Sequence, residues 1–220
     1  MMGRRQTLGS AFSILVAGAA VLWPARSEAS IFDLGVQGGV LKRSLSDIDY
    51  NTSFAWQLHG EMTFFPFFMA GPYVTFTSAT AEVSNTETPS KIDFRTLGVR
   101  LKLKIPVTDS VAPFGVVGMG WAHANFPDQI LTICQPGVPA CLQKGVPNAT
   151  ANFAEFIVGG GLQWTFAAPL ALSAEFNWRP TSGYTNDVYE RQVQSKQTTA
   201  PDPSRNGVAW VGLIGVELTL

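Results

Sequence analysis

The feature that most constrains the fold is a pair of long alternating segments at residues 153–179. On one face they carry Phe156, Val158, Gly160, Leu162, Trp164, Phe166, Leu170, Leu172, Ala174, Phe176 and Trp178. On the other face, polar and small residues predominate, so the period of two predicts strands joined by a tight turn at 167–169. Each segment has about ten or more residues, whereas strands usually have about five or six. This length suits a tilted strand that crosses a bilayer, which needs roughly 9–11 residues.

Composition supports a membrane protein without membrane-spanning helices. The mean hydropathy is +0.14 and only 14% of residues are charged. After residue 29, no apolar run approaches the length of a transmembrane helix. A closed β-barrel is the other structure that can span a membrane, because in lipid every backbone polar group needs a hydrogen-bond partner within the protein. We therefore predict an all-β fold, an eight-stranded antiparallel up-and-down transmembrane β-barrel.

The first 29 residues have the organisation of a signal peptide. Arg4 and Arg5 precede an apolar segment at 11–23, and Ser27 and Ala29 provide small residues before a cleavage site. The apolar segment is too short to span a membrane. We expect residues 1–29 to be a signal peptide and residues 30–220 to form the outer-membrane β-barrel domain.

Further alternating segments predict the remaining strands. The expected strands span residues 31–42, 52–64, 68–80, 91–105, 111–125, 153–166, 170–179 and 207–220. Short connections at 65–67, 106–110 and 167–169 alternate with long ones, the longest being 126–151 and 180–206. This alternation is typical of outer-membrane barrels with short periplasmic turns and long external loops.

Two positions predict irregular strands. Pro72 lacks a backbone donor, so we expect a bulge or a local break in the ladder there. In the segment 91–105, Ile92 and Phe94 have one parity and the later apolar residues have the other. That change of parity predicts a bulge near Arg95 and Thr96.

Charged residues of the inward parity are candidate barrel-interior residues. They are Asp33, Glu61, Arg100, Lys102, Lys104, Glu155, Glu175, Arg179 and Glu217. The interior of an eight-stranded barrel is narrow and filled by side chains, and buried charges must be paired or hydrated. The charges therefore predict either a salt-bridged polar plug or a narrow path for ions or water.

Aromatic residues collect near the predicted strand ends. The candidate interface aromatics are Trp56, Phe64, Phe67, Phe68, Trp121, Phe153, Trp164, Phe166, Trp178 and Trp210. Aromatic girdles at the two membrane surfaces produce this distribution.

With the FIVGGGLQW sequence at residues 156–164, the mature chain resembles the small eight-stranded outer-membrane proteins of Gram-negative bacteria, such as OmpX and the OmpA transmembrane domain. The resemblance covers the whole mature chain and lies in the strand pattern more than in single motifs. The chain differs in ending on Leu220, where these proteins usually end on an aromatic residue. The resemblance implies location in the cell outer membrane.

Other candidate sites are few. Cys134 and Cys141 lie in an exported chain around two prolines and a glycine, so we expect them to form one local disulfide. His59 and His123 have no adjacent serine, and no acid–base–nucleophile set converges, so we predict no enzyme, no catalytic residues, no cofactor and no metal site. The glycines at 159–161 lie within a strand and are expected to relieve crowding inside the barrel.

The resulting functional hypothesis is a structural or surface-interaction role with four extracellular loops. The expected partners are outer-membrane lipids, the barrel insertion machinery during assembly, and an extracellular ligand bound through loops 126–151 and 180–206. A formal net charge of −1 with no clustered basic face excludes nucleic acid as a partner. The alternatives are a narrow channel for ions or small solutes, a lipid A-modifying enzyme and, more remotely, a soluble lipid-binding barrel.

Overall fold

The structure is a computed structural model that describes residues 31–45, 48–81, 90–126, 129–133, 142–146, 149–185 and 207–220. Eight long strands make up the main body: β1 (Phe32–Leu45), β3 (Ser53–Phe65), β4 (Phe68–Ala81), β5 (Ser90–Lys104), β6 (Val111–Phe126), β9 (Ala149–Ala167), β10 (Leu170–Thr185) and β11 (Gly207–Thr219). Three short strands accompany them: β2 (Ile48–Asp49), β7 (Gln129–Ile133) and β8 (Leu142–Val146). Within the described ranges, no helix is long and apolar enough to cross a membrane.

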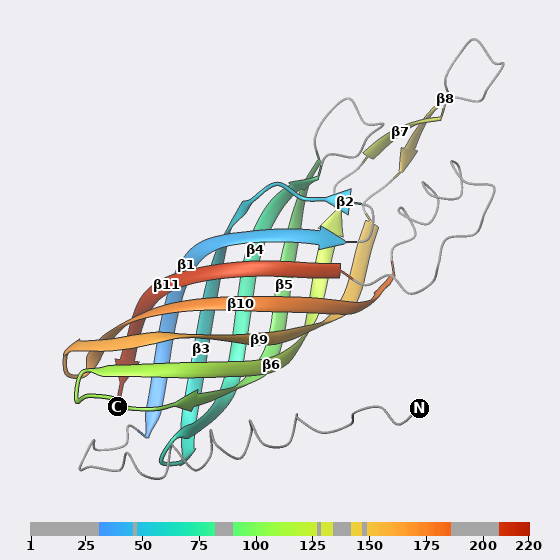
Figure 1. The fold of residues 1–220 in the computed structure, drawn as a ribbon. Helices are drawn as coiled ribbons and strands as arrows, with labels where there is room; N and C mark the ends of the chain where they lie inside the picture. Colours follow the sequence, from blue (N-terminus) through green and yellow to red (C-terminus); the bar gives the residue numbers. More distant parts are fainter. Residues whose placement is uncertain are drawn as a thin grey trace, which may run out of the picture.

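The eight long strands close into a barrel (Figure 1). Each long strand pairs antiparallel with the next one along the chain, in the order β1, β3, β4, β5, β6, β9, β10 and β11. The ring closes between β1 and β11, whose register runs unbroken from Asp33–Thr219 to Leu45–Gly207. The predicted eight-stranded up-and-down topology is therefore confirmed.

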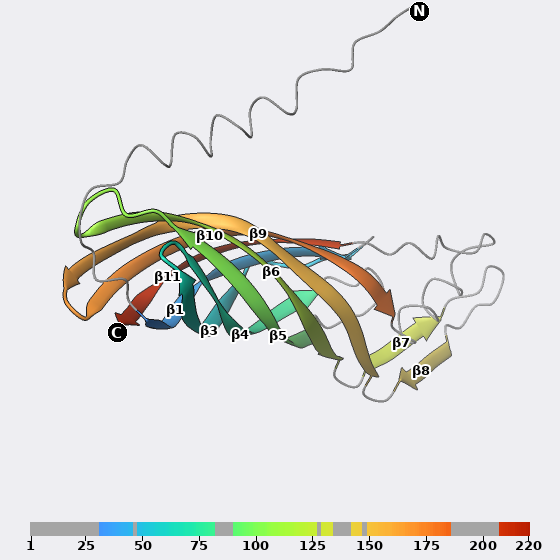
Figure 2. The same cartoon turned by 90° about the horizontal axis from the view of Figure 1, so that it is seen from below.

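The two ends of the barrel differ in their connections. At the end that we call the turn end, the strands are joined through residues 66–67, 105–110 and 168–169. Leu220 also lies there, and its backbone exchanges hydrogen bonds with that of Phe32. The opposite end, which we call the loop end, carries the longer connections, and the β7–β8 hairpin lies beyond it (Figures 1 and 2).

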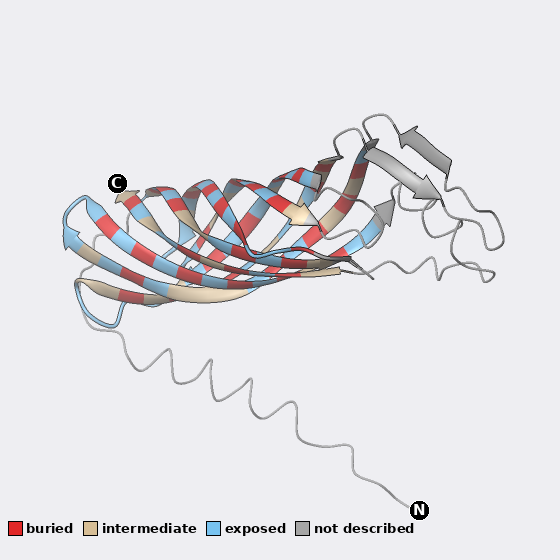
Figure 3. Ribbon diagram, turned by 90° about the horizontal axis from the view of Figure 1, so that it is seen from above, coloured by how far each residue is buried: buried red, intermediate tan, exposed pale blue. Residues whose placement is uncertain are grey.

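Buried and exposed residues alternate along the strands (Figure 3). The outward positions carry large apolar side chains, among them Val36, Leu101, Met119 and Ile214, which are all at least half exposed. Many inward positions carry polar or charged side chains that are almost completely buried. The barrel thus has an apolar outer wall and a lumen packed with polar groups, which is the reverse of a water-soluble fold.

The predicted bulge near Arg95 and Thr96 is wrong. The pairing of β5 with β4 and with β6 keeps one register throughout the strand. Ile92 and Phe94 keep the inward parity and are each 1% exposed, because the lumen near the loop end is filled by apolar side chains. The change of hydrophobic parity therefore reflects a change in the lumen and not in the backbone.

The prediction at Pro72 is confirmed as a local gap in the ladder without a bulge. The β3–β4 register is the same on both sides of Pro72, but Gly60 and Glu61 have no paired partners opposite Gly71 and Pro72. On its other edge, Pro72 pairs with Val99 in an unbroken β4–β5 ladder. The missing donor therefore affects one edge of β4 only.

Three predicted connections are shorter than expected. β1 continues to Leu45, so Arg43 belongs to a strand and not to a loop. β10 continues to Thr185, which moves residues 180–185 out of the predicted loop 180–206. The predicted loop 126–151 contains the β7–β8 hairpin and the first residues of β9. Strands this long extend beyond the roughly 9–11 residues needed to cross a bilayer.

Candidate functional site

The lumen next to the turn end holds three acids and two lysines, which we call the turn-end cluster: Asp33, Glu61, Lys102, Lys104 and Glu217. Lys102 Nζ lies 2.9 Å from Glu217 Oε2, 3.3 Å from Glu61 Oε2 and 4.0 Å from Asp33 Oδ2. Lys104 Nζ lies 3.3 Å from Asp33 Oδ2. In the ring of strands, β5 lies directly opposite β11, so the Lys102–Glu217 pair crosses the full width of the lumen.

Arg100 forms the next layer toward the loop end. Its Nε donates to Glu61 Oε1 at 2.5 Å, and its Nη1 lies 3.0 Å from Glu175 Oε2. Glu175 also accepts a hydrogen bond from the Nδ2 of Asn177 at 2.6 Å. Arg100 thereby joins β5 to β3 on one side and to β10 across the lumen.

Arg179 forms a third layer, in which uncharged side chains take part. Its Nη1 donates to Thr75 Oγ1 at 3.1 Å and to Glu155 Oε1 at 3.2 Å, and its Nη2 donates to Gln57 Oε1 at 2.5 Å. Gln57 in turn donates to Gln37 at 3.1 Å. β10 and β4 are opposite strands of the ring, so this layer also spans the lumen.

Arg43, Tyr50, Phe94, Phe153 and Glu155 fill the lumen near the loop end, and we call them the loop-end cluster. Arg43 Nη2 donates to Glu155 Oε2 at 2.7 Å. The guanidinium carbon of Arg43 lies 4.8 Å from the ring centre of Phe94 and 5.2 Å from that of Phe153. Tyr50 packs edge-on against Phe94, with ring centres 5.5 Å apart. One arginine is therefore held by one carboxylate and two aromatic rings.

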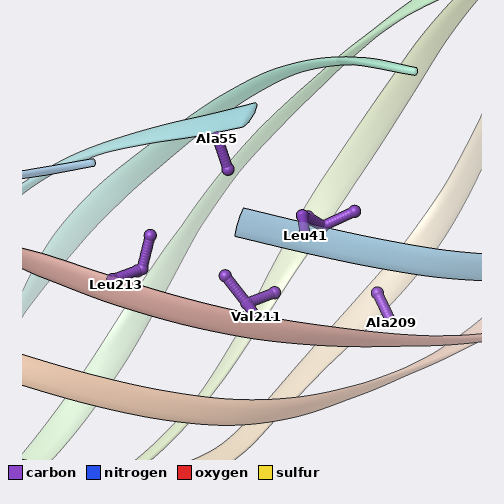
Figure 4. Close-up of a cluster of buried hydrophobic side chains, with 5 residues drawn as sticks. All are labelled: Leu41, Ala55, Ala209, Val211 and Leu213. Carbon is purple, nitrogen blue, oxygen red and sulfur yellow. The ribbon is translucent and has the colours of Figure 1, made fainter. Parts of the chain in front are cut away.

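Apolar side chains of β1, β3 and β11 also point inward in the loop-end half of the barrel (Figure 4). This group consists of Leu41, Ala55, Ala209, Val211 and Leu213. Each of them is at most 2% exposed. The lumen is consequently not polar along its whole length.

Glycines around Tyr73 provide the space that its ring occupies in the lumen. A Cβ atom at Gly98 or at Gly120 would collide with the ring or hydroxyl of Tyr73. A Cβ atom at Gly159 would collide with the side chain of Asn177. These glycines leave room for large side chains inside a narrow barrel. The expectation for 159–161 is confirmed at Gly159 and Gly161, whereas a Cβ atom at Gly160, on the outward parity, would meet only neighbouring backbone.

The lumen contains balanced charges. Five cations (Arg43, Arg100, Lys102, Lys104 and Arg179) face five anions (Asp33, Glu61, Glu155, Glu175 and Glu217). Some buried polar atoms, such as Arg43 Nε and Tyr73 Oη, have no hydrogen-bond partner among the described protein atoms. Such atoms are positions at which buried water is held in proteins. The arrangement ties opposite walls of the barrel together across the lumen.

The two histidines lie in different environments. His59 points into the lumen, where its Nε2 is 3.5 Å from Glu217 Oε1. His123 lies on the outer side of β6, and its ring nitrogens are 2.8 Å from Asn152 Oδ1 and 3.0 Å from Asn125 Oδ1. Neither has a serine or cysteine as a hydrogen-bond partner among the described residues. The described part of the chain also contains no group of three or more His, Cys, Asp or Glu side chains placed to hold a metal ion.

The structure places all nine candidate interior charges in the lumen, eight of them almost fully buried and Lys104 partly exposed at the turn end. Arg43 is a tenth lumen charge that is absent from the predicted set, because the polar residues after it suggested a loop. A signal was present, since Arg43 continues the inward parity of Gln37 and Leu41. Lys102 lies next to Glu61, whereas Glu155 pairs with Arg43 and Arg179.

The prediction that Phe153 is an interface aromatic is wrong. Phe153 is 1% exposed and points into the lumen against Arg43, so it cannot belong to an aromatic girdle. The other candidates lie on the outer wall or in a turn: Trp56, Phe64, Phe67, Phe68, Trp121, Trp164, Phe166, Trp178 and Trp210. The predicted signal peptide at 1–29 and the cysteines Cys134 and Cys141, expected to form a disulfide, lie outside the described residues.

Comparison with known proteins agrees with this architecture. The family model described as "Outer membrane protein beta-barrel domain" matches residues 11–196. Neisserial surface protein A has 10% sequence identity and a TM-score of 0.54 to this chain, over 87% of this chain and 98% of that one. OprG from Pseudomonas aeruginosa has 11% identity and a TM-score of 0.43, over 87% and 97%. The attachment invasion locus protein Ail of Yersinia pestis has 12% identity and a TM-score of 0.42, over 84% and 98%. No curated protein sequence matches the chain significantly.

Proposed function

Because the chain belongs to the outer membrane protein beta-barrel domain family, we propose that it acts as a closed scaffold that displays its four long connections outside the cell. Its location is the outer membrane of Gram-negative bacteria, where lipid surrounds the apolar wall. Its role in this proposal is structural or surface-interactive, and it is not an enzyme. The loop end faces the exterior and the turn end faces the periplasm, as in other barrels of this kind.

The observation that carries the proposal is the set of ion pairs across the lumen. Lys102 to Glu217 and Arg100 to Glu175 join strands from different sides of the ring. Breaking a buried pair by removing one partner typically costs about 3–5 kcal/mol, because the other charge stays buried without compensation. Such pairs favour a rigid filled barrel over an open pore.

In this proposal, the remaining parts of the chain serve export, assembly and ligand recognition. Residues 1–29 direct export as a signal peptide, and the barrel insertion machinery assembles residues 30–220 in the membrane. An extracellular ligand binds through the connections within 126–151 and 180–206. Cys134 and Cys141 form a disulfide in the first of these connections.

Two measurements test the closed scaffold. Purified protein in planar bilayers should show no steady conductance, whereas the double variant Arg100→Ala, Lys102→Ala should conduct if the side chains are what blocks the lumen. Protease added to intact cells should cleave within 186–206, the part of the predicted loop that follows β10. Steady conductance of the wild type, or cleavage only after the outer membrane is opened, would contradict the proposal.

A narrow path for water or ions is the second candidate. It is supported by buried polar atoms of the lumen, such as Arg43 Nε and Tyr73 Oη, that have no hydrogen-bond partner among the described protein atoms. The same bilayer recording decides between the candidates. A lipid A-modifying activity, the remaining alternative, would be detected by assaying lipid A before and after incubation with the protein.

A further inference from the structure

An amphipathic hollow lies on the outer wall near the loop end, between β3, β4 and β5. Its volume is about 380 Å³. Phe54, Trp56 and Phe76 provide its apolar side and are 40–54% exposed. Ser78, Asp93 and Arg95 provide its polar side. The filled lumen described above does not involve these outward-facing side chains.

The polar side of the hollow belongs to a boundary that runs across several strands. Phe76 pairs directly with Arg95, and Arg95 pairs directly with His123 on β6. One step toward the turn end, the paired outward residues are Leu97 and Trp121, which are 65% and 60% exposed. The outer wall therefore changes from apolar to polar at Arg95, as a wall does where hydrocarbon gives way to lipid headgroups.

Arg95 is available to a ligand at this boundary. Its side chain is exposed, and it has no ion-pair partner among the described residues. Asp93 is the one acid among the described residues that line the hollow, and it accepts a hydrogen bond from the hydroxyl of Ser78. Lys91, two residues before Asp93 on the same face of β5, is also exposed. The charges on this face of β5 therefore favour an anion.

We propose that this hollow binds a lipid with a net negative, phosphate-bearing headgroup from the surrounding leaflet. The phosphate lies against Arg95, with His123 beside it, and an acyl chain lies along Phe54, Trp56 and Phe76. A planar guanidinium suits phosphate because it can donate two parallel hydrogen bonds. An aromatic surface next to a cation matches the junction between headgroup and acyl chain.

Tryptophan quenching by brominated lipids tests this site. The probe protein keeps Trp56 as its only barrel tryptophan, with Trp121, Trp164, Trp178 and Trp210 changed to Phe. It is reconstituted in phosphatidylcholine vesicles that contain a small fraction of either brominated phosphatidylglycerol or brominated phosphatidylcholine. We expect phosphatidylglycerol to quench Trp56 more strongly, with an apparent association about fivefold higher, the size expected for one cation at an anionic lipid surface.

Arg95→Gln should abolish the preference for phosphatidylglycerol, and Arg95→Lys should retain part of it. Lys42→Gln is the matched control. Lys42 is also an exposed cation near the loop end, but it lies on β1 opposite Trp210 of β11 and does not line the hollow. Heat-modifiable gel migration verifies that each variant is folded. Equal quenching by the two lipids in the wild type, or an equal loss in Arg95→Gln and Lys42→Gln, would overturn the proposal. The second result would mean general attraction to an anionic surface and not a site.

Discussion

The two ends of the lumen are filled in different ways. In the turn-end cluster, Lys102 and Lys104 are compensated by three acids. In the loop-end cluster, Arg43 has one acid, Glu155, and rests against aromatic rings for the rest of its surface. Both clusters occupy space and satisfy charge. The first does so by many ion pairs, and the second by one ion pair and apolar packing.

This difference shows that an inward-facing position in a narrow barrel does not have to carry a polar residue. Near the turn end, the inward residues can be recognised by their charge. Near the loop end, Ile92, Phe94 and Phe153 are apolar and yet point inward. A membrane barrel has lipid outside and side chains inside, so an apolar residue can be stable on either face.

The largest expected effect is in the turn-end cluster. Lys102→Met should lower the free energy of unfolding from lipid vesicles by about 3–5 kcal/mol, since Glu61 and Glu217 would remain buried with less compensation. Urea titration monitored by tryptophan fluorescence measures it. Adding Glu217→Gln should restore part of the loss. A double variant as unstable as the sum of the two single variants would show that Lys102 and Glu217 are not coupled.

The next effect tests the direction of the neighbouring side chain. Leu101 is 53% exposed on the outer wall, whereas Lys102 is fully buried in the lumen. Leu101→Arg should impair folding into vesicles by about 2–4 kcal/mol, the cost of a cation on the lipid face near the bilayer centre. The same urea titration applies. If Leu101→Arg is as stable as the wild type, the assignment of the two faces of β5 is wrong.

A smaller effect is expected in the loop-end cluster. Arg43→Met should destabilise the barrel by about 1.5–3 kcal/mol, the range for a hydrogen bond to a charged group. The loss is limited because Arg179 still pairs with Glu155 and because methionine packs well against aromatic rings. Unfolding measured beside that of Lys102→Met compares the clusters directly. A loss for Arg43→Met larger than for Lys102→Met would reverse the comparison.

The smallest effect tests packing at the apolar positions. Ile92→Val removes one methylene from a side chain that is 1% exposed in the lumen, and it should cost about 0.5–1.5 kcal/mol. Leu97→Val, on the outer face of the same strand, should cost less because lipid chains can fill the space. Equal losses from the two substitutions would indicate that Ile92 does not pack inside the barrel.

The sequence by itself determined the class of fold and most of the wall. Alternation with a period of two, strands longer than a soluble domain needs, and short connections alternating with long ones specify an up-and-down barrel of eight strands. Apolar side chains on the outward parity specify its lipid-facing wall. The alternation and the outward parity are local, because each depends only on neighbouring residues along one strand, and the pattern of connections needs only the order of the strands along the chain.

Only the tertiary structure decided how the lumen is filled. Arg43 and Glu155 are 112 residues apart in sequence and belong to strands that are not neighbours in the barrel. No pattern along a single strand shows that Lys102 pairs with Glu217. Nor does any such pattern show that the Arg43 guanidinium packs against the rings of Phe94 and Phe153 in the lumen. Closure of the ring sets which inward side chains share one level, and the narrow lumen then makes contacts between distant strands decide the pairing.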